Sequence, residues 1–158
     1  MHRHGIPTAA YGSFSNYEQA TSYLHTASYP VVIKASGLAA GKGVVIAESY
    51  YDADEALQDF MVGGKFGMAG ASVVIEEFLD GDEASILTFS DGITTRTLPS
   101  GQDHKRIFDD DCAPNTGGMG VFAPSPKVTC QVMVRIEQDI LRPTFEGLKS
   151  EGVAACEL

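Results

Sequence analysis

The chain is poor in cysteine and has no long apolar run. Its cysteines, Cys112, Cys130 and Cys156, are odd in number and widely spaced, which excludes a disulfide framework or a Cys-x-x-Cys metal knuckle, so we expect three free thiols. No stretch of about 18 apolar residues could span a membrane, and the N-terminus lacks a secretory apolar segment. We therefore expect a cytoplasmic protein that does not enter membranes.

Basic residues are also scarce. Eleven Lys and Arg face twenty-one Asp and Glu, giving a net charge of −10, which argues against a nucleic-acid or anionic-membrane partner. An anionic small molecule would then have to be held by local lysines. The histidines His2, His4 and His25 have no cysteine or carboxylate at metal-ligand spacing, so no metal site is predicted. With 158 residues, 44% apolar and 20% charged, the composition is that of a globular protein with one modest core or two small subdomains.

Hydrophobic spacing predicts a mixture of helices and strands. The first helix would use Ser13 or Ser15 as its N-cap, and Pro143 would kink or restart the last one. Residues 100–127 show little regular pattern but many polar side chains, which is typical of a functional loop. Helices are expected over 13–28, over 52–62 and from Thr129, strands over 31–35, 44–47 and 72–79, and a hairpin between 83–90 and 94–98.

The segment Pro30–Ile46 predicts a phosphate-binding hairpin, because two β-branched runs enclose a loop of small residues. We expect Gly37, Gly41 and Gly43 to take positive φ and to let the backbone approach a ligand closely. A Walker A loop is excluded, because three residues rather than four separate Gly37 from Gly41 and a strand follows rather than a helix.

Each half of this hairpin carries a lysine. Lys34 lies inside an apolar strand, where its ammonium must reach solvent or find an anion. Lys42 lies at the loop tip, where it could follow a phosphate. The alternative is an ordinary glycine-rich hairpin with a solvated lysine.

The run Glu76-Glu77-Phe78-Leu79 closes the next apolar strand. Such a strand end can present a carboxylate and backbone groups to the edge of a purine, and Glu83 follows at a distance suited to ribose hydroxyls. The alternative is that these glutamates simply face solvent.

Two polar segments of the 100–127 region could bind a phosphorylated amine. Gln102–Arg106 contains an acid, an imidazole and two cations; Arg and Lys suit phosphate, and Asp suits an ammonium group. Pro114–Gly120 could donate backbone N–H groups to an anion. The alternatives are a solvated turn and a structural turn.

Five motifs carry a family resemblance: Arg3-His-Gly-Ile-Pro-Thr-Ala9, Val32-Ile-Lys-Ala-Ser-Gly-Leu-Ala-Ala-Gly-Lys-Gly-Val44, Ile75-Glu-Glu-Phe-Leu-Asp-Gly-Asp-Glu-Ala-Ser85, Gln102-Asp-His-Lys-Arg106 and Pro114-Asn-Thr-Gly-Gly-Met-Gly120. In this order they resemble the phosphoribosylamine–glycine ligases, also called glycinamide ribonucleotide synthetases, of the ATP-grasp superfamily. The last two motifs distinguish this ligase from other ATP-grasp proteins. The resemblance implies an α+β or α/β partial ATP-grasp fold, with a lid subdomain over 1–75 and an incomplete antiparallel-sheet subdomain over 76–158.

The resemblance also implies a function: ATP-dependent ligation of glycine to 5-phosphoribosylamine in purine biosynthesis, through a glycyl phosphate. It implies that Lys42, Asp103 and His104 take part in catalysis. The implied ATP-binding residues are Lys34, Gly37, Gly41, Lys42, Gly43, Glu76, Glu77, Phe78, Leu79 and Glu83. The implied site for glycine and phosphoribosylamine is formed by Asp103, His104, Lys105, Asn115, Thr116, Gly117 and Gly118.

The family's N-terminal α/β domain and its magnesium-binding Glu and Asn have no counterpart in this chain. We therefore expect a fragment that cannot catalyse alone, with the Mg²⁺ ligands beyond its end, and uncovered surface through which it could associate. Two other interpretations remain: a non-catalytic nucleotide-binding or interaction module, and another ATP-grasp carboxylate–amine ligase.

Overall fold

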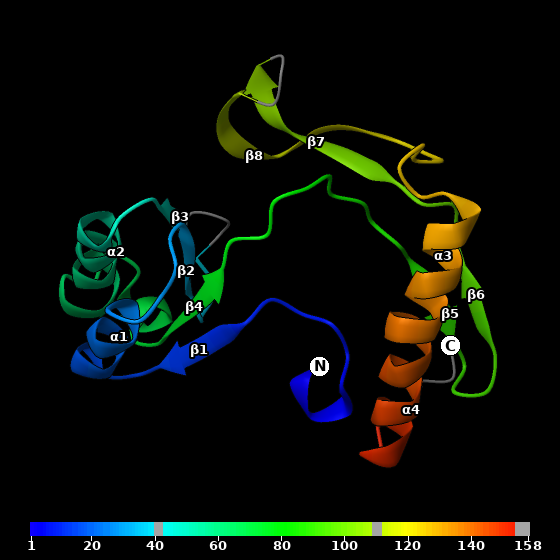
Figure 1. Cartoon of the computed structure of the whole chain (residues 1–158), viewed down its shortest axis with the longest axis horizontal. Helices are drawn as coiled ribbons and strands as arrows, with labels where there is room; N and C mark the ends of the chain where they lie inside the picture. Colours follow the sequence, from blue (N-terminus) through cyan, green and yellow to red (C-terminus); the bar gives the residue numbers. More distant parts are fainter. Residues whose placement is uncertain (40–42, 109–111, 154–158) are drawn as a thin grey trace. The chain divides into compact units, whose positions relative to one another are not determined.

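The computed structural model describes residues 1–39, 43–108 and 112–153, and the side chains at 106, 107 and 112–117 lie outside the description (Figure 1). The chain divides into two compact units. We call Ala9–Asp80 the sheet unit, and Met1–Thr8 together with Gly81–Leu158 the hairpin–helix unit. No helix in the described ranges is both long and apolar enough to cross a membrane.

The sheet unit is a four-stranded antiparallel sheet with helices on one face. Its strands run in the order β1-β4-β2-β3. Alternate residues of a strand point to opposite faces, and Val31, Ile33, Val73 and Ile75 are fully or almost fully buried. They form one core with Ala20, Leu24, Ala47, Ala53, Ala56, Leu57 and Phe60. The elements of this unit are β1 (Tyr11–Phe14), α1 (Tyr17–Leu24), β2 (Val31–Ala35), β3 (Val44–Ala47), α2 (Tyr50–Leu57), the π-helical turn η2 (Gln58–Val62), the 3₁₀ turn η3 (Gly67–Gly70) and β4 (Val73–Glu77).

The first helix begins later than its periodicity predicts. The N-cap is Asn16, whose side chain accepts a 2.9 Å hydrogen bond from the Gln19 N–H, so the expected Ser13 or Ser15 cap is wrong. Phe14 belongs to β1, where it lies opposite Val73 in the sheet. Ladder hydrogen bonds to β4 outweigh the helical spacing of this short segment.

The hairpin–helix unit contains two hairpins and one nearly continuous helical segment. Residues 100–127, expected to be irregular, contain both strands of the β7–β8 hairpin, which pair in an antiparallel ladder. Pro143 lies in the first turn of α4 and follows a π-helical turn, which confirms that the helix restarts there. The elements are η1 (His2–His4), β5 (Thr88–Ser90), β6 (Thr95–Thr97), β7 (Gln102–Phe108), β8 (Cys112–Phe122), α3 (Cys130–Ile136), η5 (Glu137–Leu141) and α4 (Arg142–Ser150).

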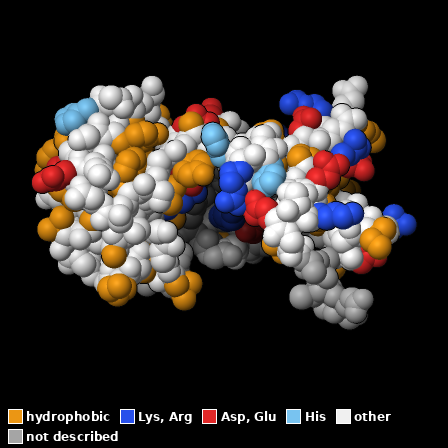
Figure 2. Space-filling view, turned by 90° about the horizontal axis from the view of Figure 1, so that it is seen from below, with side chains coloured by type: hydrophobic (Ala, Val, Ile, Leu, Met, Phe, Trp, Pro, Cys, Tyr) orange, Lys and Arg blue, Asp and Glu red, His pale blue; other side chains and the backbone are white. Residues whose placement is uncertain are grey.

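Burial differs sharply between the two units. In the described part of the hairpin–helix unit, Ile6 is the one buried apolar side chain. Large apolar side chains of this unit are exposed, including Phe89 (60% exposed) and Val121 (69%). Figure 2 shows charged side chains of both signs mixed over the face of this unit at the right of the view.

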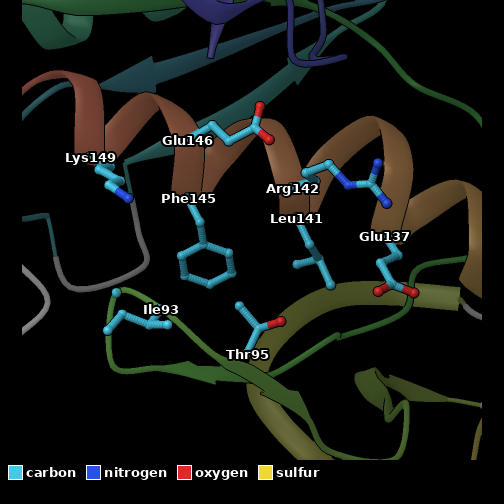
Figure 3. A pocket seen from close by; sticks show the side chains of 9 residues that line it. Ile93, Thr95, Glu137, Leu141, Arg142, Phe145, Glu146 and Lys149 are labelled. Atoms are coloured by element: carbon cyan, nitrogen blue, oxygen red, sulfur yellow. The ribbon is translucent and has the colours of Figure 1, made fainter.

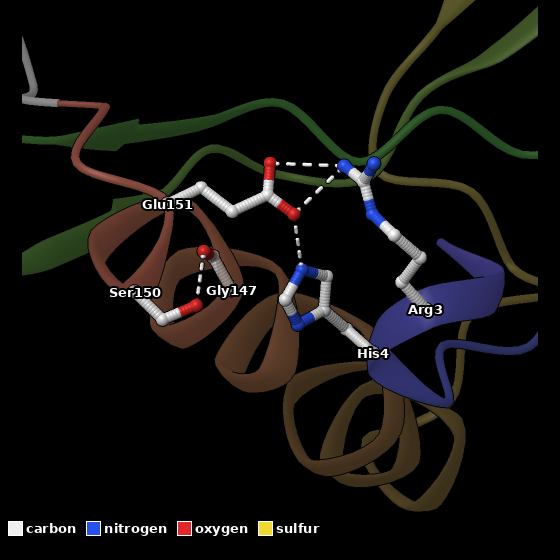
Figure 4. Close-up of polar contacts among 5 residues, drawn as sticks. All are labelled: Arg3, His4, Gly147, Ser150 and Glu151. Atoms are coloured by element: carbon white, nitrogen blue, oxygen red, sulfur yellow. Dashed lines mark hydrogen bonds and ion pairs between the residues drawn. The ribbon is translucent and has the colours of Figure 1, made fainter.

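Three side chains attach the N-terminal turn to the end of α4 (Figure 4). Arg3 Nη2 donates to both carboxylate oxygens of Glu151, at 2.8 and 3.0 Å, and His4 Nε2 lies 2.6 Å from Oε1 of Glu151. The imidazole packs on Gly147, where a Cβ would lie 2.9 Å from the ring. The His4 hydrogen bond is the main cause that holds the pKa of Glu151 below its usual value; desolvation opposes it, and the charge and hydrogen bond of Arg3 act in the same direction as His4.

Candidate functional site

The face of the sheet opposite the helices carries an ion pair between two predicted site residues. Lys34 on β2 and Glu76 on β4 place Nζ and Oε2 2.5 Å apart, with side chains 42% and 24% exposed. The strands pair so that Val32 lies opposite Glu76 and Lys34 lies opposite Val74, which puts all four on one face. Glu76 is therefore the anion that pairs with Lys34, the lysine inside the apolar strand.

Apolar side chains surround this ion pair. Val32, Val44, Ile46 and Val74 lie on the same face by register, and Val44 and Ile46 are 50% and 42% exposed. Sequence reasoning missed these residues as part of a site. The signal was the alternation within 31–35 and 44–47: every second residue turns away from the core, and apart from Lys34 those residues are apolar instead of polar.

The glycine-rich loop uses its glycines differently from the prediction. Gly37 does not take positive φ, so that expectation is wrong for Gly37. A Cβ on Gly37 would lie 2.6 Å from the Cα of Ala69, and one on Gly43 would lie 2.6 Å from the Cβ of Ala39. Close packing is therefore the reason for a glycine at both positions. Gly41 and Lys42 lie outside the described residues.

The end of β4 leads directly out of the sheet. Glu77, the last residue of the strand, donates its N–H to the Ala10 carbonyl at 2.9 Å. Phe78 and Leu79 follow, with side chains 39% and 66% exposed. An exposed apolar pair next to Glu76 is suited to contact a flat heterocycle.

In the hairpin–helix unit, two adjacent carboxylates pair with two lysines. Glu83 forms a close ion pair with Lys105 on β7, and Asp82 pairs with Lys127 at 2.8 Å. Sequence reasoning assigned Glu83 and Lys105 to different ligands and did not foresee their contact. Two residues 22 apart in an unaligned sequence give no signal for such a pair.

The β7–β8 hairpin gathers most of the predicted substrate residues. Gly118 takes φ +121°, and a Cβ there would lie 2.9 Å from an oxygen of Asp103, so the β8 backbone and this carboxylate are in close contact. The ring of His104 lies 5.3 Å from that of Phe122. Asn115, Thr116 and Gly117 belong to β8, but their side chains lie outside the described part.

A buried serine pair anchors the start of β7. Ser125 is 3% exposed and Ser100 9%. The Ser125 N–H donates to the Ser100 carbonyl at 2.8 Å, and Ser125 Oγ donates to Gln102 Oε1 at 3.2 Å. This network fixes the residue just before Asp103 and His104. Sequence reasoning did not single out either serine.

A pocket of about 300 Å³ lies between the β5–β6 turn and the η5–α4 segment (Figure 3). Ile93, Leu141 and Phe145 supply apolar surface. The other lining residues are two uncharged ones and four charged ones: Gly92, Thr95, Glu137, Arg142, Glu146 and Lys149. None of the predicted site residues lines it. In the described ranges, no three His, Cys, Asp or Glu side chains gather in a way that could hold a metal ion.

Comparison with known proteins gives a family and close relatives. The family described as phosphoribosylglycinamide synthetase, ATP-grasp (A) domain, matches residues 1–156. Over 152 residues the chain is 55% identical to a bifunctional purine biosynthetic protein of Schizosaccharomyces pombe. Over 153 residues it is 52% identical to the phosphoribosylamine–glycine ligase of Allochromatium vinosum. The crystal structure of phosphoribosylamine–glycine ligase from Thermotoga maritima superposes with a TM-score of 0.85 at 36% identity.

These relatives are much longer than the match. The comparisons cover 96%, 97% and 98% of this chain, but only 19% of the Schizosaccharomyces protein, 36% of the Allochromatium ligase and 39% of the Thermotoga chain. The mixed helices and antiparallel sheets therefore correspond to part of an ATP-grasp fold, as predicted.

Proposed function

Because this chain belongs to the phosphoribosylglycinamide synthetase ATP-grasp (A) domain family, we propose that the outer face of its sheet unit binds ATP. The observation that carries the proposal is the Lys34–Glu76 ion pair on an apolar, half-exposed face. A purine needs apolar contact for its ring and polar groups for its edge, and phosphates need a cation. This face offers all three.

The roles follow from the chemistry of each group. The Glu76 carboxylate accepts a hydrogen bond from the exocyclic amine of adenine, and Phe78 and Leu79 contact the ring. Lys34 holds the phosphates, together with the loop that contains Gly37, Gly43 and the residues around Lys42. Glu83 accepts from the ribose hydroxyls.

The whole reaction is part of the same proposal. ATP transfers its γ-phosphoryl group to the glycine carboxylate and leaves as ADP. The phosphoribosylamine nitrogen then attacks the carbonyl carbon of the glycyl phosphate, which forms the amide bond, releases inorganic phosphate and frees one proton. Asp103 binds the ammonium group of glycine, while His104, Lys105 and the Asn115–Gly118 backbone bind the phosphorylated amine. These groups position substrates and stabilise charge, so no nucleophilic side chain is required. Lys42 closes over the acyl phosphate and excludes water.

In the described ranges, no three His, Cys, Asp or Glu side chains gather in a way that could hold a metal ion. The roles proposed above therefore belong to side chains and backbone groups alone. The Mg²⁺ requirement and the cytoplasmic location stay predictions.

Calorimetric titration with the non-hydrolysable analogue β,γ-imido-ATP tests the proposal. We expect the chain to bind it, and Lys34→Met and Glu76→Gln each to weaken binding about tenfold, because each removes a hydrogen bond that involves a charged group. The matched control is Lys65→Met, which breaks the 2.5 Å Lys65–Asp59 pair of the same unit away from the site. Equal losses in all three variants, or no binding by the unaltered chain, would refute the proposal.

Turnover is measured separately, with glycine, phosphoribosylamine and ATP. We expect the chain to bind nucleotide without forming product by itself. Product formation at the rate of a full-length ligase would contradict that expectation but not the nucleotide site.

A further inference from the structure

We infer that Lys105 is a positioning residue for nucleotide binding, acting through Glu83. The inference rests on the proposed function, because it takes Glu83 as the carboxylate that binds the ribose. It gives Lys105 a role beyond the one that the sequence suggests, which is contact with a phosphorylated substrate. The observation behind it is the direct ion pair between Lys105 Nζ and Glu83 Oε1.

The Glu83 carboxylate needs such a partner. Its side chain is 64% exposed, and it follows a glycine, Gly81, that takes φ +147°, in a segment that forms no helix or strand. A long acidic side chain in solvent samples many rotamers, and a ligand that requires one of them must supply the lost entropy. An ammonium group in contact with the carboxylate selects the rotamer in advance through a charge-assisted hydrogen bond.

Lys105 is placed for this task by an irregularity in β7. The pairing of β7 with β8 shifts register between His104, opposite Gly120, and Arg106, opposite Asn115. Lys105 lies at that shift, and bulges of this kind re-aim a side chain relative to regular strand alternation. The Lys105 side chain is 37% exposed, markedly less than Glu83, so the lysine is the better-fixed partner.

The neighbouring ion pair supplies an internal control. Asp82 and Lys127 are 53% and 55% exposed and lie 2.8 Å apart. Their pair ties the same segment to the turn after β8 but includes no residue of the proposed site. If the ion pairs only tether the segment, Lys105 and Lys127 should matter equally; if Lys105 aligns Glu83, only Lys105 should affect recognition of ribose.

The experiment compares two ligands that differ only at the ribose. ADP and 2′,3′-dideoxy-ADP are titrated calorimetrically into the unaltered chain and into Lys105→Met, Lys105→Arg, Glu83→Gln and Lys127→Met. We expect Lys105→Met and Glu83→Gln to bind ADP about tenfold more weakly, the size of one hydrogen bond to a charged group, and to bind dideoxy-ADP as the unaltered chain does. Lys105→Arg should restore most of the loss, and Lys127→Met should leave the ratio of the two affinities unchanged.

The outcomes separate this inference from the proposed function. If the unaltered chain binds neither ligand, the proposed nucleotide site fails, and the inference fails with it. If the chain binds ADP but Lys105→Met weakens both ligands equally, or weakens neither, the nucleotide site stands and the role of Lys105 is refuted. An equal effect of Lys127→Met on the affinity ratio would also refute it, because tethering alone would then explain the result.

Discussion

The two units of the chain are stabilised in different ways. The sheet unit has a continuous core of side chains from three strands, two helices and the turn η2, with Phe14 of β1 packed against it. In the described part of the hairpin–helix unit, by contrast, Ile6 is the one buried apolar side chain. That second unit relies on hydrogen-bonded hairpins and on solvent-exposed ion pairs such as Arg3–Glu151 and Lys127–Asp82. Burial of apolar surface is the dominant favourable term in folding, and exposed ion pairs contribute about 0–1 kcal/mol each. We therefore expect the sheet unit to be the more stable of the two.

The chemistry of the two units also differs. The outer face of the sheet unit is apolar with one ion pair, which suits a purine and a phosphate. The hairpin–helix unit carries exposed carboxylates, lysines and a histidine, which suit polar ligands. Apolar side chains of the second unit, such as Phe89, are exposed. Self-association through this surface therefore stays a prediction.

Truncating a matched phenylalanine in each unit should show the largest difference. Phe60 is 2% exposed and packs against Phe66 with ring centroids 4.9 Å apart, so Phe60→Ala should lower the free energy of unfolding by about 3–5 kcal/mol. Phe89→Ala, at a side chain that is 60% exposed, should change it by less than about 0.5 kcal/mol. Urea unfolding followed by circular dichroism measures both. Similar losses would show that the second unit has a core comparable to the first.

Replacing one glycine in each unit should give a smaller difference in the free energy of unfolding than the phenylalanine pair. Gly37→Ala places a methyl group 2.6 Å from the Cα of Ala69, and such overpacking costs about 1–3 kcal/mol. Gly120→Ala is the control in the other unit, since a Cβ there meets nothing within 4 Å and the change should stay within about 0.5 kcal/mol. Thermal unfolding of the two variants measures both changes in stability. A neutral Gly37→Ala would mean that residues 37 and 69 move apart without cost.

Acidification should have the smallest and most local effect, on the attachment of the N-terminal turn to α4. The pKa of Glu151 is lowered chiefly by its hydrogen bond with His4. A carboxyl group whose pKa is lower in the folded state adds stability above its unfolded pKa, and that contribution is lost as the pH falls through the folded value. We expect residues 1–8 to exchange amide hydrogens faster as the pH falls below about 4.3, the usual pKa of glutamate, after correction for the intrinsic exchange rate.

Two variants test whether Glu151 causes this pH dependence. Glu151→Gln should show the faster exchange at every pH, while Glu146→Gln on the same helix should behave as the unaltered chain. Unchanged pH dependence in Glu151→Gln would mean that another group controls the attachment of the N-terminal turn.

Sequence reasoning succeeded where apolar residues follow a simple period. The strands 31–35 and 44–47 and the helical segment that ends at Val62 were predicted at nearly their observed bounds, because β-branched runs and helical spacing coincide with turn residues there. It failed for β1 and the β7–β8 hairpin. The four residues Tyr11–Phe14 are too few to show a period, and the polar, glycine-rich 102–122 region hides its strand pairing.

For the site, the sequence identified residue types but not their contacts. The position of Lys34 in an apolar strand predicted that its ammonium would reach solvent or an anion. Its partner Glu76 could not be predicted, because it is 42 positions away and is brought near by the pairing of β2 with β4. The Lys105–Glu83 pair depends on a register shift that no single-sequence pattern encodes. The need for glycine at 37 arises from packing on Ala69, which only the tertiary structure reveals.

Hydrogen–deuterium exchange with and without β,γ-imido-ATP tests the central claim most directly, that the outer face of the sheet is the nucleotide site. We predict that bound nucleotide slows exchange in β2, in β4 and in residues 76–83, and leaves α3 and α4 unchanged. Slower exchange confined to α3 and α4, or no change in β2 and β4 at saturating nucleotide, would contradict the account.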